Sequence, residues 1–525
     1  MLNTLPSISA SYDAYSLNAT TRCFEGTRQQ LISDIKSWLG GRQDEGSSVF
    51  WLNGIAGIGK STVARTVSAF ADEQRILGAS FFFSRTDGRT NPAIFFTTIA
   101  FQLAHVSPAF KKVITDVIRN DPLASGAILP LQIRKLIVEP LQNLDTIPSP
   151  VVIIVDALDE CSENGAHDIL VQLLTHLPSL PSFKVLVTSR PEHYITRVFQ
   201  KEKNLSKIVM HDIDASIAQS DIKIYLLFRF NQVTEVLPGC DWFWEEHEFL
   251  FLVMLTGSLF IYAVTAMQFI ENVRIQNPRR QLERLLKGKT SANTTSTPFV
   301  QLDKLYDQVV RDSVPPDSED ELSEQFRTVV GAVIGLEEPL SLWSIEKLLG
   351  LERGAARAAL VYLPSVIAVP DTSDGIPRVY HPSFPDYITN PKRCKHPLLV
   401  IHPHDNHLHI LTRCFSLMSS MLKRNICDIP RSARLNSEVE GLDIKVKIAI
   451  PAWLRYAVIR WPVHLAAVPP ENEGAMACME RFCLKNLLHW IEACALLGEL
   501  NLAIPLIRQA RDWAVSQHNF NHLLF

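Results

Sequence analysis

The first two hundred residues alternate short apolar runs with an amphipathic pattern, an order typical of α/β domains. Four runs are predicted as strands and lie at 49–52, 79–83, 151–155 and 184–188. The third consists of five β-branched residues without polar alternation, which suits a parallel strand covered on both faces. Val63, Val67 and Phe70 recur at helical spacing after the first run, so one helix face can pack on a sheet. Residues 46–200 are therefore predicted to form an α/β domain with a parallel sheet.

The rest of the chain follows a helical pattern. A short lead with a helix at 28–39 occupies residues 1–45, and a small helical domain is predicted at 201–312. Residues 313–395 contain helix patterns at 326–336 and 342–349, followed by strand-like stretches at 365–369 and 377–380. Helices followed by a two-stranded wing are typical of a winged helix. A C-terminal helical domain, 396–525, has helices predicted at 408–422, 450–464, 475–497 and 502–516.

The chain between the first strand and its helix has the sequence of a phosphate-binding loop. Residues 54–62 read Gly-Ile-Ala-Gly-Ile-Gly-Lys-Ser-Thr, which fits the pattern G-x-x-x-x-G-K-[ST]. Glycines allow backbone N–H groups to wrap a phosphate chain, and the helix N-terminus adds its positive dipole end. Lys60 would reach the terminal phosphates and Ser61 would hold Mg²⁺. The predicted nucleotide contacts are Gly54, Gly57, Gly59, Lys60, Ser61 and Thr62.

Acidic residues directly follow the third predicted strand. Asp156 would lie at the sheet edge where ligands bind in open α/β folds, and it fits the second Mg²⁺-holding position of this NTPase class. Asp159 and Glu160 follow closely enough to orient or activate an attacking water. Arg190 ends the fourth strand and can point toward a terminal phosphate. The alternatives are an acid-rich helix start and a surface arginine before a proline turn.

Together these motifs resemble the NACHT-type NTPases of the signal-transducing branch of P-loop ATPases, especially the fungal NACHT proteins, whose nucleotide domain is also described as nephrocystin-3-like. The resemblance extends over residues 20–520 and is most specific in the first two hundred. Its main carriers are residues 51–62, 81–87, 156–161 and 187–191. Further likeness lies at 23–28, near the base in relatives, at 257–263 in the helical domain, and at 381–387 in the winged helix.

The resemblance implies both a fold and a mechanism. An α/β P-loop NTPase domain would be followed by all-helical and winged-helix domains, with the winged helix acting as a regulatory lid rather than as a DNA reader. ADP would hold these domains closed over the nucleotide domain, and exchange for ATP would release them for self-association. In relatives the histidine at the position of His381 approaches the ADP β-phosphate and helps to hold the closed state.

This sequence departs from the family pattern in one motif of the helical domain and at both ends. Phe260 stands where many relatives in the wider class carry a proline near the adenine. The residues before the nucleotide domain are too few for an independent effector fold. No repeat period is visible after residue 400, although relatives usually carry a sensor array there. The expected sensor is therefore absent, degenerate or supplied by another protein.

Composition narrows the class of protein. Hydrophobic residues make up 47% of the chain and charged residues 20%, which is ordinary for a globular protein. A formal net charge of −4 gives no overall attraction to nucleic acid, so no nucleic-acid partner is expected. The N-terminus lacks the charged region and apolar core of a secretory signal, and nine scattered cysteines without a C-x-x-C pair indicate reduced thiols. We predict a cytoplasmic protein.

Two further segments have alternative interpretations. Residues 249–270 carry no formal charge and are long enough to cross a bilayer. The turn-forming residues 256–258 and the flanking acids favour a buried helical hairpin, so membrane contact is not expected. A possible metal cluster consists of His402, His404, Asp405, His407 and His409. The start of a helix is the favoured interpretation of this segment.

The leading functional hypothesis is a nucleotide-dependent switch that uses ATP and ADP, or GTP, with Mg²⁺. Slow hydrolysis would proceed through water near Asp159 or Glu160. The predicted partners are the nucleotide, further copies of the chain on activation, and an unidentified protein. Two alternatives stay open: a scaffold that binds nucleotide without turnover, and a membrane-associated NTPase that uses residues 249–270.

Overall fold

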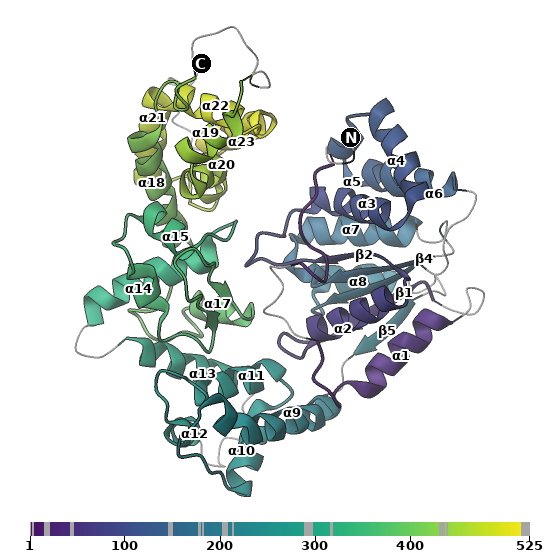
Figure 1. Ribbon diagram of the computed structural model, residues 1–525, viewed down its shortest axis with the longest axis vertical. Coiled ribbons are helices and arrows are strands. Elements are labelled where there is room, and N and C mark those ends of the chain that lie inside the picture. Colours follow the sequence, from purple (N-terminus) through teal and green to yellow (C-terminus); the bar gives the residue numbers. More distant parts are fainter. Residues whose placement is uncertain are drawn as a thin grey trace. The chain divides into compact units, whose positions relative to one another are not determined.

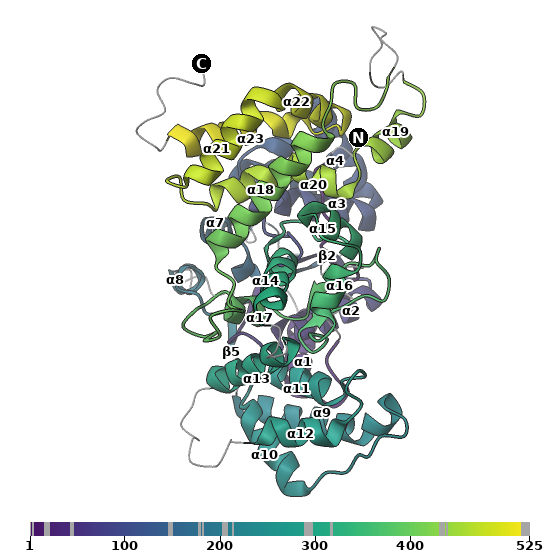
Figure 2. The ribbon, with the colours of Figure 1, turned by 90° about the vertical axis from the view of Figure 1, so that its left-hand side faces the viewer.

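The computed structural model describes the chain in segments grouped into two compact units, Met1–Leu305 and Tyr306–Phe525 (Figures 1 and 2). The described residues are 2, 5–14, 22–41, 47–144, 151–176, 180, 183–201, 208–212, 215–287, 298–314, 319–429, 436 and 439–515. Each unit is presented by itself. The five domains expected from the sequence, with their boundaries, stay a prediction.

A five-stranded parallel sheet forms the centre of the first unit. Its strands are β1 (Val49–Asn53), β2 (Leu77–Phe82), β3 (Val151–Asp156), β4 (Phe183–Ser189) and β5 (Ile208–Asp212), in the spatial order β2-β3-β4-β1-β5. The four predicted strands are thus present with small shifts at their ends. The prediction of an all-helical pattern from residue 201 was wrong at β5, which pairs in parallel with β1. Only Ile208, Val209 and Met210 of β5 are apolar, too short a run to predict a strand.

Helices cover both faces of this sheet (Figure 1). The helices of the domain are α1 (Gln29–Gly40), α2 (Lys60–Glu73), α3 (Phe95–Val106), α4 (Pro108–Asn120), α5 (Leu129–Ile133), α6 (Glu139–Gln142), α7 (Glu163–His176) and α8 (His193–Lys201). Short helical turns are η3 (Pro92–Ile94), η4 (Ala124–Gly126) and η6 (Leu158–Glu160), and η5 (Arg134–Val138) is a π-helix.

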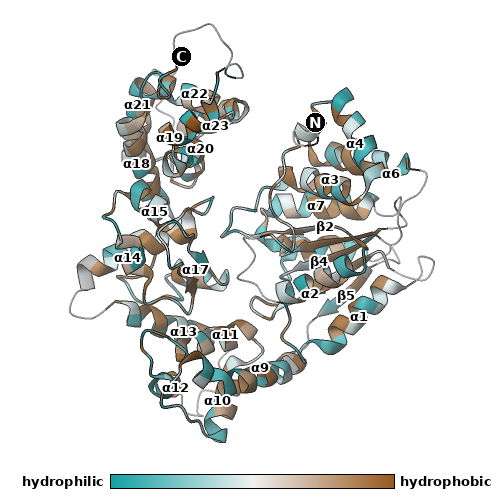
Figure 3. Cartoon of the chain, in the orientation of Figure 1, coloured by the Kyte–Doolittle hydropathy of each residue, from teal (hydrophilic) through white to brown (hydrophobic). Residues whose placement is uncertain are grey.

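Successive strand residues point to the two covered faces. On β1, Phe50 and Leu52 pack with α1 and α2, whereas Val49 and Trp51 pack on the side of α3 and α7. All four are buried, and the strands appear as hydrophobic arrows in Figure 3. A strand that is buried on both faces needs apolar residues at every position, which explains the absence of polar alternation in the sequence.

The N-terminal lead packs on the sheet domain. Leu2, Leu5 and Ala10 are buried in the core cluster that also contains residues of α3. The Phe82 backbone N–H donates to the Ala10 carbonyl (2.9 Å), and the Tyr12 N–H donates to Ser80 Oγ (2.9 Å). The lead therefore runs beside β2 and contributes to the same core.

A group of helices completes the first unit: α9 (Ala215–Val236), α10 (Glu246–Thr256), α11 (Phe260–Ile270) and α12 (Pro278–Leu286). The helical hairpin predicted at 249–270 is present as α10 and α11, with Gly257 in the turn at a φ of 56°. Among the described residues, no helix combines the length and apolarity needed to cross a membrane. Residues 290–298 are polar and poor in helix formers, which predicts a loop or linker. This segment lies outside the described residues up to Pro298, where α13 (Pro298–Ser313) begins.

The second unit is mostly helical. After α13 it contains α14 (Glu319–Gly335), α15 (Leu342–Leu349), α16 (Ala355–Leu360), α17 (Ser383–Ile388), α18 (Pro403–Met421), α19 (Leu442–Ala449), α20 (Ala452–Ala466), α21 (Glu473–Lys485), α22 (Leu487–Leu496) and α23 (Leu500–Val515). Two short antiparallel strands, β6 (Ile367–Ala368) and β7 (Arg378–Val379), follow α16. They lie within the predicted strand-like stretches but are shorter. In the C-terminal part, α18 packs along α20 (Figure 2).

Two predictions about the C-terminal helices were wrong. The helix expected at 475–497 is broken at Asn486, whose N–H closes α21 on Phe482 O (2.8 Å) and whose side-chain oxygen accepts from Ser419 Oγ (3.0 Å). This tertiary hydrogen bond favours a bend that the apolar pattern does not show. The helical pattern of 502–516 makes Ile504 available for packing, but this side chain is 58% exposed, and α23 instead buries Trp513, which donates to Val468 O (2.8 Å).

Candidate functional site

The segment between β1 and α2 has the backbone of a phosphate-binding loop. Gly57 and Gly59 have φ angles of 79° and 104°, in the left-handed region that side chains rarely adopt. The helix α2 begins at Lys60, so Ser61 and Thr62 occupy its first turn, where backbone N–H groups are unpaired within the helix. Glycine at 57 and 59 is thus required by the turn that aims this helix N-terminus at the loop.

Lys60 is buried against the loop that precedes it. Its Nζ donates to the carbonyls of Gly54 (2.7 Å) and Ile55 (3.1 Å), and the residue is 9% exposed. Burial lowers the pKa of Lys60 to about 8, while Asp159 opposes the shift. The ammonium group therefore lies where the loop glycines would place a phosphate chain.

Asp156 and Ser61, the two residues predicted to hold Mg²⁺, meet in the structure. Asp156 is buried and accepts hydrogen bonds from the hydroxyls of Thr188 (2.5 Å) and Ser61. Burial raises the pKa of Asp156, and these two hydroxyls together with Lys60 oppose the rise. A carboxylate beside a hydroxyl is the oxygen ligand set that Mg²⁺ takes in nucleotide sites, so the residues present fit this ion.

Asp159 and Arg190 form one hydrogen-bonded unit. The Arg190 N–H donates to Asp159 Oδ1 (2.9 Å), and Arg190 Nε lies 3.2 Å from Asp159 Oδ2. Asp159 is only 4% exposed. Both carboxylate oxygens thus face the same arginine, which brings together the ends of β3 and β4.

Glu160 is held by a residue that the sequence analysis did not select. The Arg85 N–H donates to Glu160 Oε2 (2.9 Å), and Arg85 Nη2 donates to the Asp159 carbonyl (2.9 Å). Burial raises the pKa of Glu160 to about 7, and Asp159 adds to the rise. Arg85 lies just beyond β2, as Arg190 lies just beyond β4. A charged residue after a parallel strand was therefore the sequence signal that could have identified Arg85 as a site residue.

Arg28 connects the helical part of the first unit to the phosphate loop. It is 3% exposed, donates from Nη2 to Ile58 O (2.6 Å) and pairs with Asp221 on α9 (3.5 Å). Its guanidinium lies over the ring of Phe260, 5.2 Å from the centroid. The Ile261 N–H, at the start of α11, donates to the Gly57 carbonyl (3.1 Å). Phe260, where the sequence departs from the family pattern, therefore packs against Arg28.

His381 belongs to the second unit, where its imidazole is oriented by its neighbours. Nδ1 accepts the Ser383 N–H (3.1 Å) and lies 2.7 Å from Ser383 Oγ, which in turn lies 2.8 Å from the Tyr306 hydroxyl. Since Nδ1 accepts a backbone N–H, the neutral ring carries its proton on Nε2.

The candidate metal cluster on α18 contributes to helix packing. His407 Nδ1 lies 2.8 Å from His464 Nδ1 on α20, and His404 Nδ1 lies 2.8 Å from Ala467 O. Burial lowers the pKa of His464 to about 3, which favours its neutral form. In the part of the chain that the structure describes, no group of three or more His, Cys, Asp or Glu side chains is arranged to hold a metal ion.

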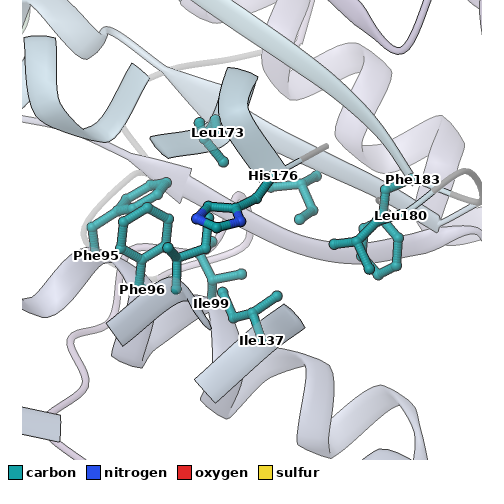
Figure 4. A pocket seen from close by; sticks show the side chains of 10 residues that line it. Phe95, Phe96, Ile99, Ile137, Leu173, His176, Leu180 and Phe183 are labelled. Atoms are coloured by element: carbon teal, nitrogen blue, oxygen red, sulfur yellow. The ribbon is translucent and has the colours of Figure 1, made fainter. Parts of the chain in front are cut away.

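An apolar cavity lies on the opposite face of the sheet from α2. It is lined by residues of α3, η5, α7 and the sheet, including Phe95, Phe96, Ile99 and Phe183 (Figure 4). His176 is its polar lining residue, and burial lowers the pKa of this imidazole. The cavity has none of the carboxylates or cations that gather at the phosphate loop, so we do not assign it to the same site.

Comparisons with known proteins support the P-loop interpretation. Residues 26–190 match the family model "Nephrocystin 3, N-terminal". No curated protein matches the chain.

Similar solved structures include three archaeal proteins. A Walker-type ATPase of Pyrococcus abyssi shares 16% identity, with 73% of this chain and 98% of that chain covered and a TM-score of 0.31. Cdc6p from Pyrobaculum aerophilum shares 13% identity, with 69% of this chain and 92% of that chain covered and a TM-score of 0.31. The Aeropyrum pernix ORC1 protein in complex with DNA shares 16% identity, with 70% of this chain and 90% of that chain covered and a TM-score of 0.31.

The family match covers the phosphate loop, the acids after β3 and Arg190. The same residues converge at the carboxyl ends of parallel strands, next to a left-handed glycine turn and a helix N-terminus. Residues 26–190 therefore have the fold and motifs of a P-loop NTPase domain and are similar to the N-terminal domain of nephrocystin 3.

Proposed function

We propose that this protein is a nucleotide-dependent switch that binds ATP and ADP with Mg²⁺ and hydrolyses the triphosphate slowly. One observation carries the proposal: the glycine turn with Lys60, the Ser61–Asp156 pair, and two acids held by arginines converge at one edge of the sheet. Such a site can hold phosphates, a hard cation and an attacking water at once. GTP is the alternative nucleotide.

Each group has a separate task in this proposal. Lys60 and the N-terminus of α2 bind the phosphates, and Ser61 and Asp156 hold Mg²⁺, which would neutralise charge on the phosphate oxygens. Both oxygens of Asp159 face Arg190, so this carboxylate orients the arginine. Glu160, with a pKa near 7, is better suited to take a proton from water.

The contacts behind the loop support coupling between nucleotide and helices. The carbonyls of Gly57 and Ile58 accept from Ile261 and Arg28, and Arg28 pairs with Asp221. A change in loop conformation therefore alters hydrogen bonds to α9 and α11. In the second unit, we propose that α14–α16 with β6 and β7 act as a winged-helix lid, and that His381 approaches the β-phosphate in the ADP state.

The proposed consequence of exchange for ATP is release of the helical parts and self-association, together with binding of an unidentified protein partner. No nucleic-acid or membrane partner is part of the proposal. We propose a cytoplasmic location, because the scattered cysteines without a C-x-x-C pair are typical of reduced thiols.

Binding of fluorescent ADP and ATP to Lys60→Ala tests the site. Loss of the ammonium is expected to weaken binding by about 10- to 100-fold, because a hydrogen bond to a charged group contributes ~1.5–3 kcal/mol. Lys112→Ala, which changes an exposed lysine on α4, is the control and should bind like the wild type. Wild-type affinity in Lys60→Ala would refute the phosphate-cradle assignment.

Phosphate release with and without Mg²⁺ tests hydrolysis. We expect slow, Mg²⁺-dependent release by the wild type. Stoichiometric bound nucleotide without any release would favour the scaffold that binds without turnover.

A further inference from the structure

The loop after β2 is closed on itself by two backbone hydrogen bonds. The Ser84 N–H donates to Arg89 O (3.2 Å) and the Arg89 N–H donates to Ser84 O (2.8 Å). Gly88, with a φ of 68°, makes the turn, and the Asp87 N–H donates to Ser84 Oγ (3.2 Å). We name residues 84–89 the β2 clasp. Its backbone is fixed at both ends, unlike that of an open surface loop.

A buried arginine supports the β2 clasp from within. Arg89 is 2% exposed, donates from Nε to Phe82 O (2.8 Å) and pairs with Asp87 (2.8 Å). A buried charge is tolerated only when it is paired and hydrogen-bonded, so these contacts tie the clasp to the end of β2. The Phe83 N–H donates to Asp156 O (3.1 Å), which anchors the base of the clasp to the strand that carries the Mg²⁺-site carboxylate.

Arg85 joins the β2 clasp to the two acids after β3. Its backbone N–H holds Glu160 Oε2, and its guanidinium holds the main chain at Asp159. A free Glu side chain samples many rotamers, and burying it in one costs up to ~2 kcal/mol in conformational entropy. The β2 clasp fixes the Glu160 side chain when the domain folds, so this entropy cost does not arise again when the nucleotide binds. Pre-orientation of a reacting group is one of the larger contributions that a site makes to rate.

We propose that the β2 clasp is a further part of the nucleotide site, in which Arg85 is a positioning residue that holds Glu160 for water activation. This inference rests on the proposed function, because Glu160 is taken there as the base. The inference assigns a role to the segment 81–87, which the sequence indicated only through its resemblance to the NACHT-type NTPases.

Hydrogen exchange in nucleotide-free protein tests the contact itself. Glu160→Ala removes the acceptor of the Arg85 N–H, so exchange at the Arg85 amide is expected to rise about tenfold or more, the equivalent of a hydrogen bond to a charged group. Glu163→Ala, an exposed acid at the start of α7, is the matched control and should leave that amide unchanged. Unchanged exchange in Glu160→Ala would overturn the inference, even in a protein that hydrolyses ATP.

Turnover of Arg85→Ala tests the contribution of the guanidinium, because this variant keeps the backbone N–H that binds Glu160 and loses the donor to the Asp159 carbonyl, which positions the same segment. We expect kcat to fall by about 10- to 100-fold, the range typical for loss of a supporting contact, with the Kd for ATP and the Tm unchanged. Arg85→Lys should recover part of the rate, and Arg119→Ala, an exposed arginine on α4, should behave like the wild type.

Two kinetic results would contradict the role of Arg85. An unchanged kcat in Arg85→Ala would show that the guanidinium does not position the acids, and a Kd for ATP weakened by the same factor as kcat would make the guanidinium a phosphate ligand instead. A wild-type protein without turnover would refute the proposed hydrolysis, whereas the exchange experiment separately decides whether the contact exists.

Discussion

Ionisable side chains around the phosphate loop are buried, and each has a specific partner. Lys60 uses loop carbonyls, Asp156 uses hydroxyls, and Asp159 uses Arg190. Removing a charge from water is costly unless it is paired and hydrogen-bonded, so these contacts make the cluster compatible with a folded domain. The same burial moves the pKa of Lys60 and of Glu160 toward neutrality, where proton transfer is efficient.

The pH dependence of turnover follows from Glu160. Its pKa is raised from 4.5 to about 7, so the ionised form needed by a base grows as pH rises through about 7. At saturating ATP we expect the rate to increase from about pH 6 to about pH 8 and then level off. Glu160→Gln should remove most of the turnover, while Glu163→Gln should keep the profile. A rate independent of pH over this interval would exclude Glu160 as the base.

The same shift has a defined sign for stability. Because the folded-state pKa of Glu160 is higher than its unfolded value, the protonated carboxyl stabilises the fold below the unfolded value of 4.5. That contribution is lost as pH rises through about 7. Ionisation of Glu160, which the proposed hydrolysis requires, therefore lowers the stability of the fold.

At the scale of elements, β4 carries a lysine that holds the end of a helix. Lys184 is 5% exposed and donates to the carbonyls of Trp38, Leu39 (3.3 Å) and Gly41 (3.0 Å) at the C-terminus of α1. These carbonyls are among those that a helix leaves unpaired, and a cation there is favoured by the helix dipole. This explains a charged residue at the start of an otherwise uncharged strand.

Replacement of this lysine should loosen α1. Lys184→Met is expected to lower the free energy of unfolding by about 1–3 kcal/mol, because it leaves helix-end carbonyls without their donor. Urea unfolding followed by circular dichroism would measure the change, with Lys112→Met as the exposed control. Equal stability of Lys184→Met and the wild type would show that water satisfies these carbonyls equally well.

At the scale of the whole molecule, the division between the two units falls inside α13. Leu305 ends the first unit and Tyr306 begins the second. Within the second unit, Tyr306 packs edge-on against Phe384 and lies 2.8 Å from Ser383, the residue that orients His381. The histidine motif is thus packed on the part of α13 that belongs to the second unit.

Retention of ADP is the expected readout of this motif. If His381 donates to the β-phosphate in the ADP state, His381→Ala should speed release of fluorescent ADP about tenfold or more, since hydrogen bonds to charged groups contribute ~1.5–3 kcal/mol. His402→Ala, which changes an exposed histidine before α18, should release ADP like the wild type. Unchanged off-rates in His381→Ala would remove His381 from the site.

Prediction from the sequence succeeded where contacts are local. The phosphate loop, its helix and four buried strands were predicted, because glycine turns, helix starts and strands covered on both faces constrain neighbouring residues. The break at Asn486 and the strand β5 were missed, because a hydrogen bond to Ser419 and pairing with β1 decide them. Neither interaction can be recognised from the local pattern of apolar and polar residues.

The sequence by itself therefore determined the class of ligand: residues 54–62 and 156–160 carry phosphate and cation chemistry within a few positions of one another. Only the tertiary structure decided how the acids are used. Asp159 meets Arg190 across 31 positions, and Glu160 meets Arg85 across 75. Parallel strands end at one edge of a sheet however far apart they lie in the chain, so side chains that follow them converge there. The register of that sheet, and not the spacing of the motifs, gives each carboxylate its partner.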